Sequence, residues 1–204
     1  MSTAAEAHPG HVVLVGMMAT GKSTVGEWLA ARLGRPFLDS DRLIEARTGH
    51  TVKEIFAGRG EAGFRREESA ALAESLAASA PVVIAAAGGA VLDPANRRLI
   101  RQAGSAGGLV VWLRAEPDEL ARRAASGSHR PLLDHDPLAT LTRLAAVREP
   151  LYREVADLEI DETGPDGVLT TSQIGQRILT RVRPDGGTQR PASGESSTRA
   201  RRRS

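Results

Sequence analysis

The segment Gly16-Met17-Met18-Ala19-Thr20-Gly21-Lys22-Ser23 constrains this chain more than any other, because it has the pattern G-x-x-x-x-G-K-S. It follows the apolar run of residues 11–15 and precedes a helical pattern over residues 23–33. Glycines in such a loop let successive backbone N–H groups turn inward around phosphate oxygens, and the helix N-terminus adds the positive end of its dipole. The alternative is an ordinary glycine-containing turn. The Lys-Ser pair at this place favours a phosphate-binding loop (P-loop), and therefore a nucleoside triphosphate site.

Two side chains of this loop carry the chemistry. Lys22 places an ammonium group against the β- and γ-phosphates, and the Ser23 hydroxyl can ligate Mg²⁺. The chain has 25 arginines but only two lysines, Lys22 and Lys53. A lysine at position 22 of so arginine-rich a chain indicates that a compact ammonium is needed there.

Composition sets the outer limits. A length of 204 residues suits a single α/β domain with a sizeable core. Cysteine is absent, which excludes disulfides and thiolate metal sites. The chain does not begin with a basic-then-apolar signal pattern and has no apolar run of membrane-spanning length. We therefore expect a cytoplasmic protein without a membrane partner.

The positive net charge of the chain comes from its C-terminal segment. Residues 184–204 hold five arginines against two acidic residues, so the rest of the chain is close to −1 within a total of +2. We therefore expect the folded part not to bind nucleic acid. The segment is rich in Pro, Gly, Ser and Arg and is expected to be disordered, as residues 1–9 are expected to be flexible. Its arginines could contact RNA or a membrane, but a solubilising appendage is the preferred interpretation.

Apolar and amphipathic segments alternate along the chain, which predicts an α/β fold. Strands are expected at residues 11–15, 36–38, 82–86, 109–113 and 158–160, and helices at 23–33, 42–48, 51–56, 61–80, 94–103, 117–125, 138–147, 150–156 and 172–182. Strands that are apolar throughout indicate a five-stranded parallel sheet covered on both faces, a three-layer sandwich. Ligands bind at the carboxyl ends of such strands. The P-loop, Asp39/Asp41 and Gly88-Gly89 each follow a strand and should converge on one crevice.

Five further motifs follow the P-loop in order: Asp39-Ser40-Asp41, Phe64-Arg65-Arg66-Glu67-Glu68, Gly88-Gly89-Ala90-Val91, Arg130-Pro131-Leu132-Leu133 and Arg148-Glu149-Pro150-Leu151-Tyr152. With this set, over about residues 12–182, the chain resembles the shikimate kinases, P-loop kinases related to the nucleoside monophosphate kinases. The resemblance implies one domain at residues 10–183, with a substrate-binding region at about 40–68 and a lid at about 122–136. It also implies a monomer that transfers phosphate from ATP to the 3-hydroxyl of shikimate, in aromatic amino acid biosynthesis.

The same resemblance implies the residues that bind ATP: Gly16, Ala19, Thr20, Gly21, Lys22, Ser23, Thr24, Arg123 and Arg130. Arg130 corresponds to a lid arginine that reaches the transferred phosphate. Arg123 corresponds to one that stacks on adenine, with the adjacent Arg122 as the alternative. Mg²⁺ is implied at Ser23 directly and at Asp39 through water, and the catalytic residues are Lys22, Asp41 and Arg130.

The acceptor has its own requirements, since shikimate is a trihydroxy cyclohexene carboxylate. Guanidinium groups match carboxylates bidentately, which makes Arg65 and Arg148 the candidates for a carboxylate clamp. The resemblance assigns them that contact and assigns Asp41 the role of catalytic base. It implies five more substrate-site residues: backbone at Gly88 and Gly89, which side chains would obstruct, the apolar walls Phe56 and Phe64, and Glu68, which orients Arg65.

Each of these residues has an ordinary structural alternative. Arg65 and Glu68 lie three apart on a helix and could form a surface ion pair. Asp39 and Asp41 could belong to a turn and a helix N-cap, with Asp41 partly capping the next helix. Phe56 and Phe64 could simply be core residues. The occurrence of all these motifs in one order favours the functional interpretation.

Two positions depart from the family pattern, which usually has glycine where Ala19 and Ala87 stand. Ala19 adds a methyl near the phosphates and makes a positive φ costly, and we expect both changes to be tolerated. They leave room for a related kinase acting on another hydroxylated carboxylic acid, such as gluconate. A third hypothesis is a regulatory nucleotide-binding protein without activity. The joint presence of Lys22, Asp41, Arg65, Arg130 and Arg148 argues against it.

Overall fold

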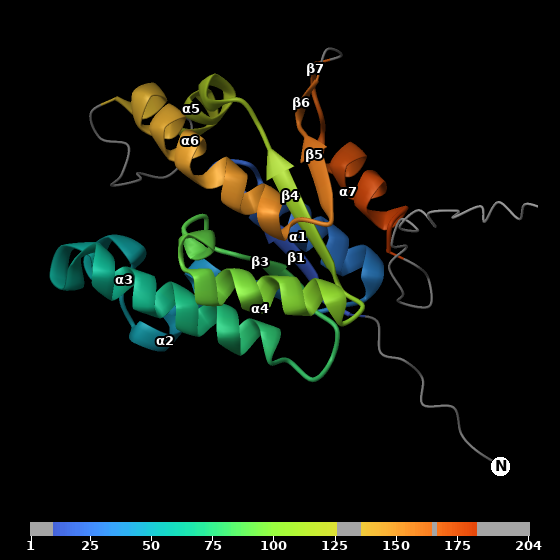
Figure 1. Ribbon diagram of the computed structural model, residues 1–204, viewed down its shortest axis with the longest axis horizontal. Helices are drawn as coiled ribbons and strands as arrows, with labels where there is room; N and C mark the ends of the chain where they lie inside the picture. Colours follow the sequence, from blue (N-terminus) through green and yellow to red (C-terminus); the bar gives the residue numbers. More distant parts are fainter. Residues whose placement is uncertain (1–9, 126–135, 165–166, 183–204) are drawn as a thin grey trace, which may run out of the picture.

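The structure is a computed structural model that describes residues 10–125, 136–164 and 167–182 (Figure 1). Its elements in chain order are β1 (Val12–Val15), α1 (Lys22–Leu33), β2 (Phe37–Asp39), α2 (Ser40–Thr48), α3 (Val52–Leu76), β3 (Val83–Ala85), the 3₁₀ helix η1 (Ala90–Leu92), α4 (Pro94–Ser105), β4 (Leu109–Arg114), α5 (Pro117–Ala125), α6 (Pro137–Val155), β5 (Leu158–Asp161), β6 (Thr163–Gly164), β7 (Gly167–Val168) and α7 (Thr171–Leu179).

The five strands β1 to β5 form one parallel sheet in the order β2-β3-β1-β4-β5. At its centre, Val13 of β1 stands beside Ile84 of β3 and Val110 of β4. Strands β1 and β3 are buried along their whole length, as expected for parallel strands covered on both faces. The predicted five-stranded parallel sheet is confirmed.

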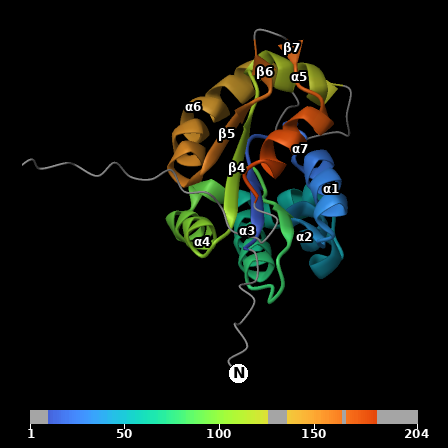
Figure 2. The same ribbon diagram turned by 90° about the vertical axis from the view of Figure 1, so that its right-hand side faces the viewer.

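Helices cover both faces of this sheet and complete three layers (Figure 2). On one face α1 and α7 bury Leu29 and Ile178 against the sheet. On the other face α3, α4 and α6 contribute Leu72, Ile100 and Tyr152 to the larger core cluster. The helices of both outer layers thus bury apolar side chains against the sheet, whose central strands β1 and β3 are buried on both faces.

Helices α2 and α3 form a subdomain with its own small core of Ile44, Ile55, Phe64 and Ala71 (Figure 1). A capping box between Thr51 and Glu54 starts α3. The helix is broken at Gly60, whose φ of 65° and ψ of −178° are not helical. The predicted break between the helices at residues 51–56 and 61–80 is therefore confirmed. The second half of α3 ends at Leu76 rather than at the predicted residue 80.

The prediction of two helices at residues 138–147 and 150–156 is wrong, because α6 is continuous from Pro137 to Val155 with Pro150 inside it. Proline removes one backbone donor and usually bends or ends a helix. Here buried residues lie on both sides of it, among them Leu141 and Tyr152. Packing of this face against the sheet outweighs the local cost.

Three short elements were not predicted: η1 and the two-residue strands β6 and β7, which pair antiparallel. The predicted flexible N-terminus (1–9), most of the predicted lid (126–135, with Arg130) and the C-terminal segment lie outside the described residues. None of the helices within the described ranges is long and apolar enough to cross a membrane.

Candidate active site

The loops that follow β1, β2 and β3 line one cavity of about 680 Å³. These strands are neighbours in the sheet, so their carboxyl ends open side by side. The P-loop, Asp39/Asp41 and Gly88-Gly89 all contribute to its walls, which confirms that the three segments meet in one crevice. Fifteen of the predicted site residues line it: Ala19, Gly21, Lys22, Ser23, Thr24, Asp39, Asp41, Phe56, Phe64, Arg65, Glu68, Gly88, Gly89, Arg123 and Arg148.

The P-loop owes its shape to three residues with positive φ, Gly16 (145°), Ala19 (67°) and Gly21 (74°). A Cβ at Gly16 would lie 2.4 Å from the Leu113 carbonyl oxygen, so only glycine fits there. Thr20 is buried and its hydroxyl donates to the Met17 carbonyl at 2.8 Å. Gly16 and Thr20 shape the loop without lining the cavity.

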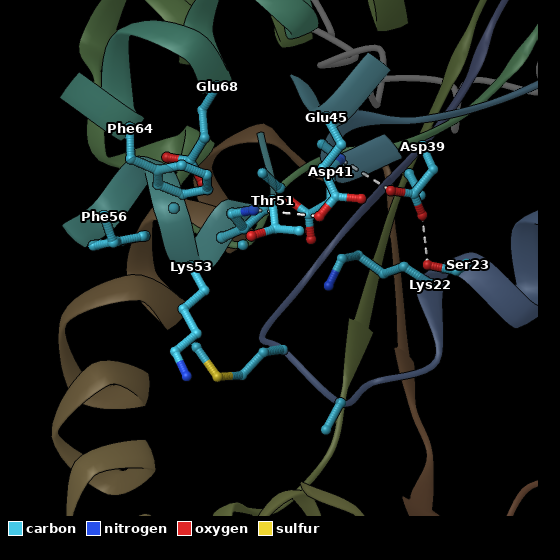
Figure 3. Close-up of a pocket in the computed structure, with 18 of the residues that line it drawn as sticks. Lys22, Ser23, Asp39, Asp41, Glu45, Thr51, Lys53, Phe56, Phe64 and Glu68 are labelled. Atoms are coloured by element: carbon cyan, nitrogen blue, oxygen red, sulfur yellow. Dashed lines mark hydrogen bonds between the residues drawn. The ribbon is translucent and has the colours of Figure 1, made fainter. Parts of the chain in front are cut away.

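Lys22 begins α1 and folds back over the loop. Its ammonium donates to the carbonyls of Gly16 at 2.9 Å and Met17 at 2.7 Å. The Lys22 and Asp41 side chains extend from opposite walls toward the same space (Figure 3). A cation and a carboxylate in this arrangement can hold a phosphoryl group and a hydroxyl near one another.

Asp39 links the P-loop helix to α2. Its Oδ2 accepts a hydrogen bond from the Ser23 hydroxyl at 2.6 Å, and its Oδ1 accepts from the N–H groups of Asp41 and Arg42 (Figure 3). Asp39 is thus the N-cap of α2, and the predicted partial capping by Asp41 is wrong. Because Asp39 does the capping, the Asp41 carboxylate can line the cavity two residues further along.

The Ser23–Asp39 pair is suited to a hard divalent cation. Among the described residues no group of three or more His, Asp or Glu side chains is arranged to hold a metal. Magnesium usually takes one or two protein oxygens and completes its shell with water and phosphates. The Ser23 hydroxyl and the Asp39 carboxylate, which meet beside the N-terminus of α1, fit this coordination pattern.

Arg65 and Glu68 of α3 form a pair that reaches into the cavity. Arg65 Nη1 donates to Glu68 Oε2 at 2.5 Å, and its Nη2 donates to Glu61 at 2.9 Å. The Glu68 side chain is only 3% exposed. Burial raises the pKa of Glu68, the charge of Arg65 lowers it and that of Asp41 raises it again. The pair is therefore not an ordinary surface ion pair, but a buried anchor that fixes the guanidinium.

Arg148 of α6 is the second buried cation of this wall, 3% exposed. Its Nη1 lies 3.4 Å from the Gly88 carbonyl oxygen, and its Nε is buried with no hydrogen-bond partner among the described residues. A buried charged donor without a partner is costly. A carboxylate bound beside Arg148 would satisfy it.

The loop after β3 lies close to its neighbours at its two glycines. A Cβ at Gly89 would lie 1.7 Å from Arg65 Nη1, and one at Gly88 would lie 3.3 Å from the Gly16 carbonyl oxygen. The buried Tyr152 hydroxyl donates to the Gly88 carbonyl at 2.6 Å. Burial raises the pKa of Tyr152, so its hydroxyl remains a donor. Ala87 is not among the described residues with positive φ, so its backbone conformation does not require glycine.

Phe56 and Phe64 form the apolar side of the cavity. Their ring centroids are 4.6 Å apart, and both rings belong to or pack on the small core of α2 and α3. They also line the cavity. They are thus core residues that also line the cavity, and their contact with a substrate stays a prediction.

Arg122 and Arg123 are neighbours on α5, but their side chains have different surroundings. The Arg122 side chain is 71% exposed and pairs with Glu119, whereas Arg123 lines the cavity. Arg123 Nη1 also donates to the Ala19 carbonyl at 3.3 Å and to Glu162 Oε2 at 2.6 Å. The geometry thus favours Arg123.

Similar proteins are known, and they show which family this chain belongs to. A family model described as shikimate kinase matches residues 18–183, most of the chain. The chain belongs to the shikimate kinase family. A shikimate kinase of Symbiobacterium thermophilum is 51% identical over 153 residues, which cover 74% of this chain and 85% of that protein.

Solved structures agree with this membership. A shikimate kinase from Acinetobacter baumannii in complex with shikimate is 40% identical, with a TM-score of 0.76, and the match covers 84% of this chain and 92% of that one. A gluconokinase from Sinorhizobium meliloti covers 84% of this chain and 94% of its own at 24% identity and a TM-score of 0.52, which shows a shared fold alone.

Several residues of this shikimate kinase family site were not predicted. Glu45, Thr51, Val52 and Lys53 line the cavity (Figure 3). Lys53 carried a usable signal, since it is one of only two lysines beside 25 arginines. Glu45 carried none, because its carboxylate meets the Val52 N–H, at 3.2 Å, only after α2 and α3 have packed together.

Proposed function

We propose that this member of the shikimate kinase family transfers the γ-phosphoryl group of ATP to the 3-hydroxyl of shikimate. The observation that carries the proposal is the placement of two arginines, Arg65 and Arg148, in the cavity that the P-loop also lines. A phosphate-binding loop and a pair of cations for a carboxylate in one cavity match a donor nucleotide and an anionic acceptor.

The proposed reaction is an in-line displacement. The acceptor oxygen forms a bond to the γ-phosphorus while the bond to the bridging oxygen of ADP breaks, and the hydroxyl proton passes to Asp41. Lys22 and Arg130 stabilise the charge on the transferred group, and Arg123 contacts the adenine. Arg130 lies outside the described residues, so its part rests on the sequence motif.

The acceptor is held at its other end. Arg65 and Arg148 bind the carboxylate, and Glu68 fixes Arg65 through the contact of 2.5 Å. Phe56 and Phe64 pack against the ring, and the backbone at Gly88 and Gly89 approaches it closely. The buried, unpartnered Nε of Arg148 supports this assignment.

Magnesium is proposed as the cofactor, held by the Ser23 hydroxyl directly and by Asp39 through water. The ion would neutralise part of the charge on the phosphates of the nucleotide. The Ser23–Asp39 distance of 2.6 Å supports a shared site for the two oxygens. The single domain at residues 10–183, the lid at 122–136, the disordered tail, the monomeric state and the cytoplasmic location remain predictions.

A coupled assay of ADP release with shikimate, quinate and gluconate tests the proposal. Shikimate should be turned over at least ~100-fold more efficiently than gluconate, because a site that hydrogen-bonds specific hydroxyls rejects substrates that leave its groups unpaired. Equal or faster turnover of gluconate would support the alternative, a kinase for another hydroxylated acid. ADP release with none of the three would favour the non-catalytic hypothesis.

A further inference from the structure

The apex of the P-loop contains a strained residue. Ala19 has a φ of 67°, and it is the one non-glycine residue with positive φ within the described ranges. The Cβ of an L-residue makes this conformation unfavourable. Such a residue persists only where its surroundings hold it in place.

The contact that holds Ala19 comes from a distant part of the chain. Arg123 of α5 donates from Nη1 to the Ala19 carbonyl at 3.3 Å. The same nitrogen donates to Glu162 Oε2 at 2.6 Å, and Arg123 Nε donates to Glu119 Oε1 at 2.6 Å. The carboxylates of Glu162 and Glu119 thus fix the Arg123 guanidinium beside the P-loop.

Glu162 is the more deeply buried of these carboxylates, 1% exposed. Its Oε2 takes the hydrogen bond from Arg123, while its Oε1 is buried without a hydrogen-bond partner in the described part of the chain. Its backbone is fixed to the sheet, since its N–H donates to the Arg114 carbonyl at 2.8 Å. Burial raises the pKa of Glu162, and the charges of Arg123 and Lys22 lower it. A buried carboxylate whose backbone is hydrogen-bonded to the sheet restricts where its partner guanidinium can lie.

We propose that Glu162 is a positioning residue for the nucleotide site. It holds Arg123 so that the guanidinium braces the Ala19 carbonyl and keeps the P-loop in its phosphate-binding shape. The brace offsets the cost of alanine at a position where glycine would adopt the same φ without strain. The inference rests on the proposed function only in taking this loop as the nucleotide site.

A double-mutant cycle separates this role from an ordinary structural ion pair. Glu162→Met removes both acceptor oxygens at similar volume, and Ala19→Gly removes the strain. The affinity of a non-hydrolysable ATP analogue is measured by calorimetry for the wild type, both single variants and the double variant, without any acceptor. Loss of the Glu162 charge acts on the phosphates equally in both backgrounds, so the cycle isolates the coupling to Ala19.

We expect Glu162→Met to weaken nucleotide binding by a factor about fivefold larger in the wild-type background than in the Ala19→Gly background. Glu162→Gln, which keeps one acceptor oxygen, should give an intermediate value. Glu159→Met on β5, three residues before Glu162, removes an exposed carboxylate that pairs with Arg153 at 3.8 Å, and it should leave the affinity unchanged. Shikimate affinity should be unchanged in all of them.

Factors that agree within twofold in the two backgrounds, or that differ in the opposite sense, would overturn the proposal. Thermal unfolding checks each variant, and if Glu162→Met does not fold, Glu162→Gln takes its place in the cycle with the same criterion. The proposed function can fail separately, because absence of shikimate turnover leaves the nucleotide cycle measurable.

Discussion

Ala19 shows how one residue can set the stability of a loop. Its left-handed conformation costs about 1–2 kcal/mol for a residue with a Cβ, whereas glycine costs about 0.5–1 kcal/mol in backbone entropy. We therefore expect Ala19→Gly to raise the free energy of unfolding by about 0.5–1 kcal/mol in urea titrations.

The matched control is Ala30→Gly in the middle of α1, where the backbone is helical. The same change there should lower the free energy of unfolding by about 1 kcal/mol. Equal destabilisation by both substitutions would show that Ala19 is not strained.

Lys22 tests the P-loop at the same scale. Its ammonium contacts loop carbonyls at 2.9 and 2.7 Å rather than core groups, so Lys22→Ala should fold normally. Turnover should fall by about 10²–10³, the scale of a lost transition-state charge contact. Steady-state kinetics with a melting curve checks this, and Arg177→Ala on the exposed side of α7 serves as the control. Near-normal turnover of Lys22→Ala would overturn its catalytic assignment.

At the scale of elements, α6 joins the acceptor loop to the core. Tyr152 is buried, and its hydroxyl donates to the Gly88 carbonyl at 2.6 Å. Gly88 in turn lies against the P-loop, because a Cβ on it would be 3.3 Å from the Gly16 carbonyl oxygen. One helix thereby sets the position of the loop that approaches the acceptor.

Tyr152→Phe should therefore weaken shikimate binding more than nucleotide binding. It leaves the Gly88 carbonyl with the longer contact of 3.4 Å from Arg148, and it should cost about 1–2 kcal/mol of stability. Calorimetry with shikimate and with an ATP analogue, each below the melting transition, measures the two affinities. Unchanged shikimate affinity, or equal weakening of both ligands, would contradict a positioning role.

Much of this arrangement could be predicted from the sequence because its signals are local. Strands such as β1 and β3 are apolar throughout, and the P-loop and the Phe-Arg-x-x-Glu motif are short runs with fixed spacing. The continuity of α6 through Pro150 could not be predicted, since tertiary packing overrides the local effect of proline.

The contacts of Arg123 with Ala19 and Glu162 also could not be predicted from local sequence patterns. Arg123 meets Ala19 across 104 residues and Glu162 across 39. No local sequence pattern indicates that the fold brings Glu119 and Glu162 to Arg123. The capping role of Asp39 rather than Asp41 likewise depended on where β2 ends.

At the scale of the whole molecule, the strand order explains why one cavity serves two substrates. Because β2, β3 and β1 are neighbours, the loops proposed to bind the metal, the acceptor and the phosphates open side by side. The subdomain of α2 and α3 adds Arg65, Phe56 and Phe64, and α6 adds Arg148. In the proposed function, an acceptor between these parts would be held at its carboxylate by the arginines and at its hydroxyl by Asp41.

Substitutions of the residues at the two ends of the acceptor should have different effects. Asp41→Asn should lower turnover most, because proton acceptance fails while the carboxylate anchor remains. Arg65→Ala and Arg148→Ala should mainly weaken shikimate binding, by about 2–3 kcal/mol each, the scale of a lost charge-assisted hydrogen bond. Affinity for an ATP analogue should change little in all three variants.

The most direct test of the central claim is a calorimetric titration of shikimate into the wild type and into Arg148→Ala. Arg97→Ala is the matched control, since Arg97 is a partly buried arginine that pairs with Glu154 at 3.0 Å and does not line the cavity. We expect the wild type and Arg97→Ala to bind shikimate alike, and Arg148→Ala to bind it about 30- to 150-fold more weakly. A wild type that ignores shikimate, or an Arg148→Ala variant that binds it as tightly as the wild type, would contradict the account.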